Sequence, residues 1–425
     1  MKRLLNNLDV AIYHEKMASG LDVYVIPKPE ASGIYATFTT HYGSIDREFV
    51  PYGETKMVTV PDGIAHFLEH KVFEQNHRED PFTFFGQNGS DCNANTSNYK
   101  TSYLFTGPDH LEENLIYLLD FVRDPYLTEE NVEKEKGIIE QEIKMNQDNP
   151  AWQGFDGILA NTFQKHPIRI PIAGTVESIY QITKKDLETC YKTFYRPENM
   201  FLVISGNVDA EATLALVRKH EENVEKDSYL PERSEYQEPD EVGVPFAKTE
   251  GNVTNHRIFI GYKFKLEDTG LTRDETYNYI SLMTNLKFGG VSDFLEKMEQ
   301  QKLVVDEIDY DLVYTNQHIL LIISAETKNP ELLSKKIKEE MLLDDLVESD
   351  FLRKRKTLLS SCIYMSDNFY RLNEKIMNDL ILNGTVNYDL YGDIKALTFE
   401  KMMQVKKRIS YNHVSEFWIE PKKNL

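Results

Sequence analysis

Cysteine is scarce in this sequence, with three residues in a chain of 425. Cys92, Cys190 and Cys362 are widely spaced and odd in number, which excludes a disulfide framework and a cysteine-based zinc site and favours a reducing compartment. No stretch approaches the roughly 18 apolar residues of a membrane-spanning helix, and the basic N-terminus is not followed by the apolar segment of a signal peptide. We therefore expect no membrane association and a cytoplasmic location.

The sequence also lacks an excess of basic residues. It contains 48 Lys and Arg against 69 Asp and Glu, for a formal net charge of −21. Phosphate groups would be repelled by this charge, which argues against nucleic acid or an anionic membrane as the main partner. The contents of 41% hydrophobic and 28% charged residues are those of an ordinary globular protein.

The length of the chain exceeds what one hydrophobic core usually serves, so we expect two domains, 1–230 and 231–425. The boundary is placed in a charged, proline-containing segment, 225–245. Strands are predicted at 21–26, 34–42, 93–105, 200–205, 257–265, 318–325 and 416–419. Helices are predicted at 62–74, 110–122, 129–145, 184–193, 210–223, 275–286, 330–346 and 350–384. Both halves mix strands and helices at similar length, which indicates a structural duplication.

The predicted helix 62–74 carries the pattern His66-Phe67-Leu68-Glu69-His70. Hydrolysis by zinc needs about three protein ligands, an open position for water and a carboxylate that is not a ligand. His66 and His70 are four residues apart and project from one helix face, with Glu69 beside them. This is the inverted order of a known zinc-peptidase motif. A chance match is expected in roughly a few per cent of such sequences, so the motif alone leaves the site open.

A second helix, 129–145, carries two glutamates, Glu135 and Glu142, on one side. Helical geometry places both within an apolar stripe that includes Val132, Ile138, Ile139, Ile143 and Met145. Carboxylates in such a stripe are costly unless a cation or donor meets them. The alternative is a solvated charged helix, but other residues already account for its solvated face. A zinc ion held by the two histidines would satisfy Glu142, and Glu135, two turns earlier, could orient a ligand or the water.

These elements together resemble the pitrilysin/insulinase family of zinc peptidases, in its shorter form related to mitochondrial processing peptidase. The resemblance is closest to the metal-bearing member of paired bacterial peptidases of this family, and it rests on residues 63–70, on Asn93-Ala94 and on the helix with the two glutamates. The implied zinc ligands are His66, His70 and Glu142. Glu69 is implied as the general base, and Glu135 matches the second important glutamate of the family.

The resemblance further implies an α+β fold. Each of two structurally related domains is a mainly antiparallel sheet covered by helices, and together they form half of a clam-like shell. Two such halves enclose a chamber that admits peptides or unfolded segments. The residues matched to an edge strand that binds the substrate are Asn93, Ala94, Asn95 and Thr96. An open strand near the metal would bind an extended peptide through its main chain, with little demand on sequence.

One departure from the family concerns an Arg and a Tyr that face the zinc in self-sufficient members. By alignment, Glu299 and Asp306 stand at these positions. Acidic side chains would repel the developing oxyanion that Arg and Tyr stabilise. The resemblance therefore implies a heterodimer in which a related chain supplies the Arg and the Tyr.

Several alternatives remain open from sequence alone. The chain could be a noncatalytic structural or peptide-binding member of the same fold, or a metal-binding module without turnover. Two imidazoles and a carboxylate favour zinc over manganese. The natural substrate, and the choice between a homodimer and a heterodimer, are not indicated by the residues.

Overall fold

The structure, a computed structural model, describes residues 2–5, 8–226 and 229–422. Its contacts divide the chain into two units, each assembled from three segments. The first unit comprises Met1–Ile143, Pro171–Glu235 and Cys362–Leu390, and the second comprises Lys144–Ile170, Tyr236–Ser361 and Tyr391–Leu425. Residues 144–170 therefore belong to the second unit and residues 362–390 to the first. A single boundary near residue 230 does not separate the two units.

The first unit contains a seven-stranded sheet in the order β1-β2-β3-β9-β4-β8-β7. Its strands are β1 (Lys2–Leu5), β2 (Ala11–Lys16), β3 (Asp22–Pro27), β9 (Met200–Gly206), β4 (Ile34–Thr40), β8 (Thr101–Gly107) and β7 (Asp91–Thr96). All neighbours are antiparallel except β3 and β9, which are parallel. A short ribbon of β5 (Glu48–Phe49) and β6 (Val58–Thr59) lies apart from this sheet.

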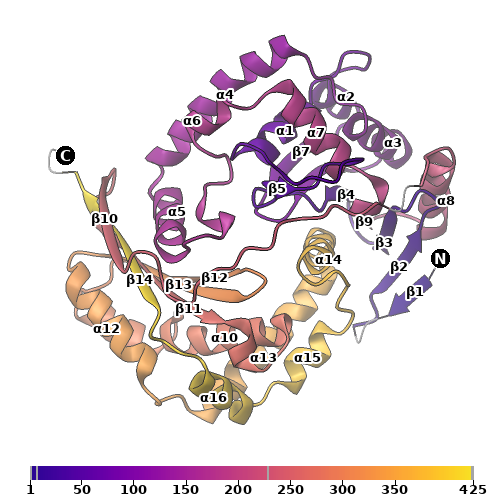
Figure 1. The fold of residues 1–425 in the computed structure, drawn as a ribbon. Coiled ribbons are helices and arrows are strands. Elements are labelled where there is room, and N and C mark those ends of the chain that lie inside the picture. The colour runs from indigo at the N-terminus through magenta and orange to yellow at the C-terminus, as the bar shows by residue number, and fades with distance from the viewer. Residues whose placement is uncertain (1, 6–7, 227–228, 423–425) are drawn as a thin grey trace. The chain divides into compact units, whose positions relative to one another are not determined.

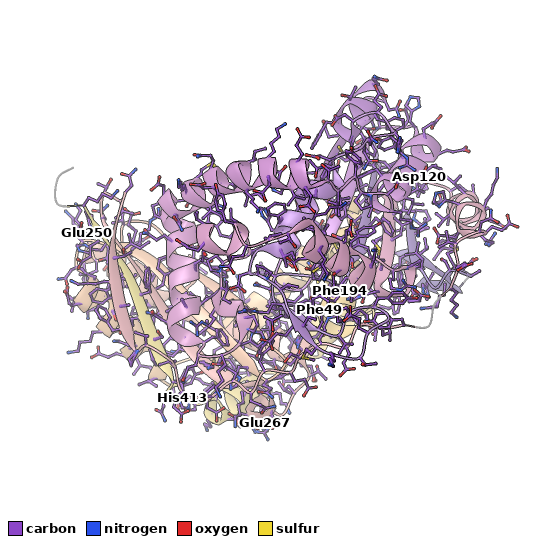
Figure 2. All side chains as sticks on the ribbon, turned by 45° about the horizontal axis from the view of Figure 1, so that its top comes forward. Phe49, Asp120, Phe194, Glu250, Glu267 and His413 are labelled. Atoms are coloured by element: carbon purple, nitrogen blue, oxygen red, sulfur yellow. The ribbon has the colours of Figure 1, made fainter. Side chains whose placement is uncertain are left out.

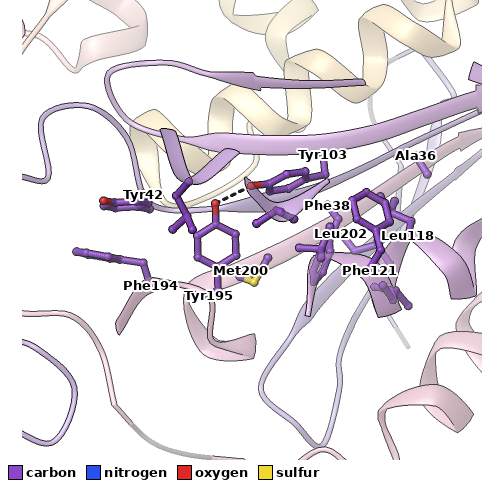
Figure 3. Close-up of a cluster of buried hydrophobic side chains, with 14 of the residues drawn as sticks. Ala36, Phe38, Tyr42, Tyr103, Leu118, Phe121, Phe194, Tyr195, Met200 and Leu202 are labelled. Carbon is purple, nitrogen blue, oxygen red and sulfur yellow. Dashed lines mark hydrogen bonds between the residues drawn. The ribbon is translucent and has the colours of Figure 1, made fainter. Parts of the chain in front are cut away.

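Helices of the first unit cover the sheet, and most of them form its main core together with the strands. They are α1 (Ile64–Val72), α2 (Pro81–Gln87), α3 (Leu111–Val122), α6 (Val176–Ile179), α7 (Lys184–Phe194), α8 (Ala210–Glu221) and α14 (Phe369–Asn383), and α4 (Glu129–Asp148) begins in this unit. Figure 3 shows core side chains from several of these elements, including the Tyr103 and Tyr195 hydroxyls, which are 2.8 Å apart. The core reaches the short ribbon through Phe49, whose ring is 4.7 Å from that of Phe194 (Figure 2).

Strand β4 is buried on both faces along its whole length. Ile34, Ala36 and Phe38 lie in the main core, whereas Thr37 and Thr39 point to the other face. That polar face is covered by α14, which packs on β4 and β9 (Figure 1). Oγ1 of Thr37 donates to Oδ1 of Asn373 at 2.8 Å, and Nδ2 of Asn373 donates to the Val203 carbonyl at 2.9 Å. These bonds satisfy polar groups that burial would otherwise leave unpaired.

The second unit repeats the strand arrangement of the first. Its sheet has the order β10 (Phe246–Gly251), β14 (Val414–Pro421), β11 (His256–Lys265), β13 (His318–Thr327) and β12 (Ile308–Tyr314). One pair, β10 and β14, is parallel and the others are antiparallel, so the order and directions match β3-β9-β4-β8-β7. Its helices are α5 (Pro150–Thr162), α9 (Leu266–Thr269), α10 (Arg273–Phe288), α11 (Asp293–Gln300), α12 (Pro330–Leu342) and α16 (Phe399–Arg408). Helices α13 (Glu348–Asp367) and α15 (Leu390–Ala396) cross from one unit's segments to the other's. The predicted α+β class and structural duplication are confirmed.

Two predicted elements were wrong in extent. The single strand expected at 93–105 is the hairpin β7–β8, closed by a turn in which Ser97 N donates to the Lys100 carbonyl. The single helix expected at 350–384 is two helices, because Asn368 leaves the helical conformation and its side chain caps α14 through Arg371 N. Patterning did not reveal β2, β10, β12, α2, α5, α11, α15 or α16. Among the described residues, no helix combines the length and apolarity needed to cross a membrane.

Candidate metal centre

The start of α1 is fixed by two glycines in close contact. Gly63 has a φ of 87°, and a Cβ there would lie 2.4 Å from the Ala173 carbonyl oxygen. Gly174 has a φ of 74°, and its Cβ would lie 2.5 Å from the Asp62 carbonyl oxygen. Side chains are excluded at both positions by sterics and by the left-handed backbone. The helix is therefore held at its first turn with its histidine face in a fixed direction.

His66, His70 and Glu142 lie together. Nε2 of His66 is 3.4 Å from Oε1 of Glu142, and Nε2 of His70 is 3.4 Å from Oε2 of the same carboxylate. The three ligand atoms all lie within 4.8 Å of one another, and no other group of this kind occurs among the described residues. A tetrahedral zinc ion with ligands at about 2.0–2.1 Å places those ligands about 3.4 Å apart. The donor types and spacings of these residues fit zinc.

Glu142 lies at the border of the buried stripe and not in its middle. Val132, Ile139 and Ile143 are buried as predicted, but Ile138 is 50% and Met145 is 66% exposed. The prediction that these two residues help to bury the glutamates was wrong, because the neighbouring elements cover only one side of α4. The Glu142 side chain is 31% exposed, which leaves one side of the donor set accessible to water and a substrate.

Glu135 contacts His70 through the ring nitrogen that does not face Glu142. Its Oε1 is 3.1 Å from Nδ1 of His70, and its side chain is 9% exposed. Burial opposes ionisation of Glu135, but the bond to His70 and the charge of Lys71 keep its pKa below the usual value. Burial likewise opposes the charged form of His70, yet Glu135 and Glu142 raise its pKa to about 9. Because Nδ1 is engaged by Glu135, Nε2 is the nitrogen directed at Glu142.

Glu69 stands beside the three potential ligands without joining them. It is buried, and its Oε2 accepts a hydrogen bond of 2.5 Å from Oγ1 of Thr96. Thr96 was predicted as part of the substrate strand, and the structure adds this contact with the carboxylate. The contact links the last residue of β7 to α1, the helix that carries the two histidines.

The strand β7 is the last of its sheet and pairs with β8 alone among the described strands. Asn93 and Asn95 are exposed, and Ala94 is partly buried. The amide of Ala94 donates to its neighbour's side-chain oxygen, Oδ1 of Asn93, at 2.8 Å. The predicted substrate residues therefore lie on a polar sheet edge next to α1, which packs against β7.

Lys71, the residue after the second histidine, was not predicted from the sequence to belong to the site. Its side chain is 0% exposed, and its Nζ is 3.5 Å from Oε2 of Glu135. The spacing in the sequence offers a signal, since Lys71 follows Ile64 by seven positions and Leu68 by three and so shares the helix side of these two apolar residues, both of which are buried. Glu299 and Asp306, the positions aligned with the family's Arg and Tyr, are exposed residues of the second unit.

Two family models match the chain. Residues 57–176 match the insulinase (peptidase family M16) model, and residues 181–342 match the M16 inactive-domain model. A zinc protease of Bacillus subtilis, YmfH, is 42% identical over 381 residues, which cover 86% of this chain and 87% of that protein. The crystal structure of an M16-like peptidase from Alicyclobacillus acidocaldarius matches with a TM-score of 0.92 and 29% identity, over 99% of this chain and 100% of that one.

A protease from Helicobacter pylori shares the fold alone, with a TM-score of 0.82 and 17% identity over 97% of this chain and 100% of that chain. The matched models, the similarity to YmfH over most of both sequences and the convergence of two histidines and a glutamate agree with one another. The chain belongs to the pitrilysin/insulinase family, peptidase family M16, and is a zinc-protease-like member of it.

Proposed function

We propose that the chain is a zinc-dependent endopeptidase that cleaves peptides or unfolded segments inside an enclosed chamber. The observation that carries this proposal is that Glu142 and Glu69 make different contacts. Glu142 faces both histidines, whereas Glu69 is not part of the candidate ligand group and accepts a hydrogen bond from Thr96. Hydrolysis by zinc needs about three protein ligands, a position left open for water and one carboxylate that is not a ligand.

His66, His70 and Glu142 would hold the zinc ion. When bound, zinc supplies Lewis-acid polarisation of the scissile carbonyl and lowers the pKa of water. Glu69 accepts the proton of the attacking water and returns it to the leaving amine. Thr96 donates to Oε2 of Glu69 and fixes the orientation of the carboxylate that takes the proton. Glu135 keeps the ring of His70 oriented through Nδ1.

The edge strand β7 is proposed to bind the substrate backbone. Asn93, Ala94, Asn95 and Thr96 form the segment that an extended peptide would join as an additional strand. Main-chain pairing of this kind gives affinity with little dependence on sequence, which suits an enzyme acting on unfolded segments. The three cysteines, all free and buried, suit the reducing cytoplasmic setting included in this proposal.

A related chain is proposed to complete the active site. The positions of the family's Arg and Tyr hold the acidic residues Glu299 and Asp306, which would not stabilise an oxyanion. In a heterodimer, the partner would provide both groups while this chain provides the metal centre. Full peptidase activity of the purified chain as a monomer would contradict this part of the proposal.

The alternative is a noncatalytic, peptide-binding or structural member of the same fold. Metal analysis combined with hydrolysis of a quenched fluorescent peptide separates the possibilities. The proposal predicts one zinc per chain and zinc-dependent hydrolysis in the presence of the partner chain. Stoichiometric zinc without hydrolysis, both with and without the partner chain, would favour the noncatalytic alternative.

A further inference from the structure

Lys71 is a fully buried lysine beside the metal centre, with a side-chain exposure of 0%. Its Nζ is 2.5 Å from Oε1 of Glu74, 3.1 Å from the Asn131 carbonyl oxygen and 3.5 Å from Oε2 of Glu135. An ammonium group has three donors and no acceptor, and these three oxygens match them. Lys71 lies on α1, and Asn131 and Glu135 lie on α4, so these contacts join the two helices that carry the candidate metal centre.

The acceptors of Lys71 are themselves anchored at the start of α4. Nδ2 of Asn131 donates to Oε2 of Glu74 at 2.5 Å and to the Tyr126 carbonyl at 2.8 Å. Asn131 and Thr128 also exchange hydrogen bonds between side chain and backbone, of 2.9 and 3.1 Å. The first turn of α4 is therefore tied to the last turn of α1 through one buried cation.

We propose that Lys71 is a positioning residue of the metal centre, which acts through Glu135. It joins the end of α1 to the start of α4 and holds Oε2 of Glu135. Oε1 of Glu135 then meets Nδ1 of His70, and Nε2 of His70 faces Glu142. The inference rests on the proposed zinc site and assigns the residue that sets its geometry.

A purely structural role and a positioning role predict different changes in zinc affinity. Lys71→Met removes one partner of a buried ion pair and leaves the Glu135 carboxylate without its cation, so the stability of the chain should fall under either role. A role in positioning Glu135 predicts that zinc affinity falls as well, because methionine cannot hold the carboxylate. Zinc affinity is therefore the quantity that separates the two roles.

The test measures the zinc dissociation constant of the full chain by competition with a chromophoric chelator. Lys71→Met is expected to weaken zinc binding by about 10- to 100-fold, the range seen when groups that orient metal ligands are removed. The thermal midpoint of the metal-free variant should fall, because Glu135 is left without its cation, so zinc affinity is measured at a temperature at which the variant is folded. Lys71→Leu, whose side chain also has no hydrogen-bond donor for Glu135, provides the same measurement if the methionine variant does not fold.

The matched control is Lys136→Met. Lys136 is also buried and lies on α4, but its Nζ bonds to Glu133 and to the Tyr180 carbonyl and not to Glu135. This control should bind zinc as tightly as wild type. Equal losses of affinity in the control and in Lys71→Met would overturn the proposal.

A double-mutant cycle with Glu135→Gln tests whether Lys71 affects zinc affinity through Glu135. If Lys71 acts through Glu135, Lys71→Met should change zinc affinity much less in the Glu135→Gln background than in wild type. Equal effects in both backgrounds, or unchanged affinity of the single variant, would overturn the inference. Absence of zinc binding by the wild-type chain would instead contradict the proposed function itself, so the two failures are distinguishable.

Discussion

Oε2 of Glu69 accepts a hydrogen bond of 2.5 Å from Oγ1 of Thr96. Glu69 belongs to the metal helix α1, and Thr96 is the last residue of the edge strand β7. The proposed general base and the proposed substrate strand are thus directly connected. A peptide paired along β7 would be bound in register with the carboxylate that is proposed to accept the proton of the attacking water.

Thr96→Val should reduce the rate of peptide hydrolysis without loss of zinc. The valine keeps the volume and branching of threonine but cannot fix the carboxylate. General-base catalysis contributes about 10²–10⁴-fold, and loss of orientation alone is expected to remove about 10-fold of that in kcat. Steady-state kinetics with a quenched peptide, together with metal analysis, provide the measurement.

Thr96→Ser serves as the matched control, because it retains the hydroxyl. Its kcat should stay within a few-fold of wild type. The interpretation of the Glu69–Thr96 contact fails if the serine and valine variants lose activity equally.

Glu142→Gln should weaken zinc binding by more than about 100-fold, since it removes the only charged ligand, and loss of groups behind a ligand already costs 10- to 100-fold. Glu140→Gln is the control. Glu140 lies two residues earlier on α4 and its carboxylate accepts a hydrogen bond from the Tyr180 hydroxyl at 2.6 Å. Chelator competition on both variants checks the assignment, and unchanged zinc affinity in Glu142→Gln would remove this residue from the ligand set.

Gly63→Ala should destabilise the chain by about 1–3 kcal/mol, because a left-handed backbone and a steric contact oppose the new side chain. The φ of Gly63 is 87° and the added Cβ would meet the Ala173 carbonyl oxygen at 2.4 Å. Gly137→Ala is the control, since Gly137 lies in α4 with nothing within 4 Å of the added atom. That change should stabilise by up to about 1 kcal/mol. Denaturant unfolding of both variants gives the comparison.

The raised pKa of His220 predicts that the folded chain loses stability at alkaline pH. Hydrogen bonds to Asp120 at 2.9 Å and to Glu221 at 3.3 Å raise its pKa to about 9, from the usual value near 6.5, although burial opposes this. The folded chain therefore binds this proton more tightly than the unfolded chain. The resulting stability is fully present below about pH 6.5 and is lost as the pH rises through 9.

The change should amount to about 1–2 kcal/mol once solvent screening is included. Unfolding free energies measured between pH 6 and 10 should fall more steeply in wild type than in His220→Gln. His77→Gln, a substitution at an exposed histidine, should follow the wild-type curve. Parallel curves for wild type and His220→Gln would contradict this account of His220.

The local parts of the metal centre could be predicted from the sequence, because helix geometry fixes which residues share a face. His66 and His70 are four residues apart on one helix, and Glu142 was found from its place among apolar neighbours. The same reasoning misjudged Ile138 and Met145, which are exposed. Periodicity locates the side of a helix that faces the core, but the width of the covered area depends on neighbouring elements.

The long-range contacts could not be predicted in this way. The bond from Thr37 to Asn373 joins residues 336 positions apart, and nothing in either local pattern indicates that α14 covers β4. Lys71 was missed for a related reason, since its acceptors Asn131 and Glu135 lie on another helix. A lysine on the apolar side of a helix indicates a buried partner without identifying it.

Glu69→Gln tests the central claim most directly. The amide keeps the size of the side chain and can still accept the hydrogen bond from Thr96, but it cannot take a proton. With the partner chain present, the proposal predicts one zinc per chain, as in wild type, and a fall in kcat for peptide hydrolysis of at least about 100-fold. A variant that retains both zinc and wild-type hydrolysis would contradict the claim that Glu69 is the base of a zinc peptidase.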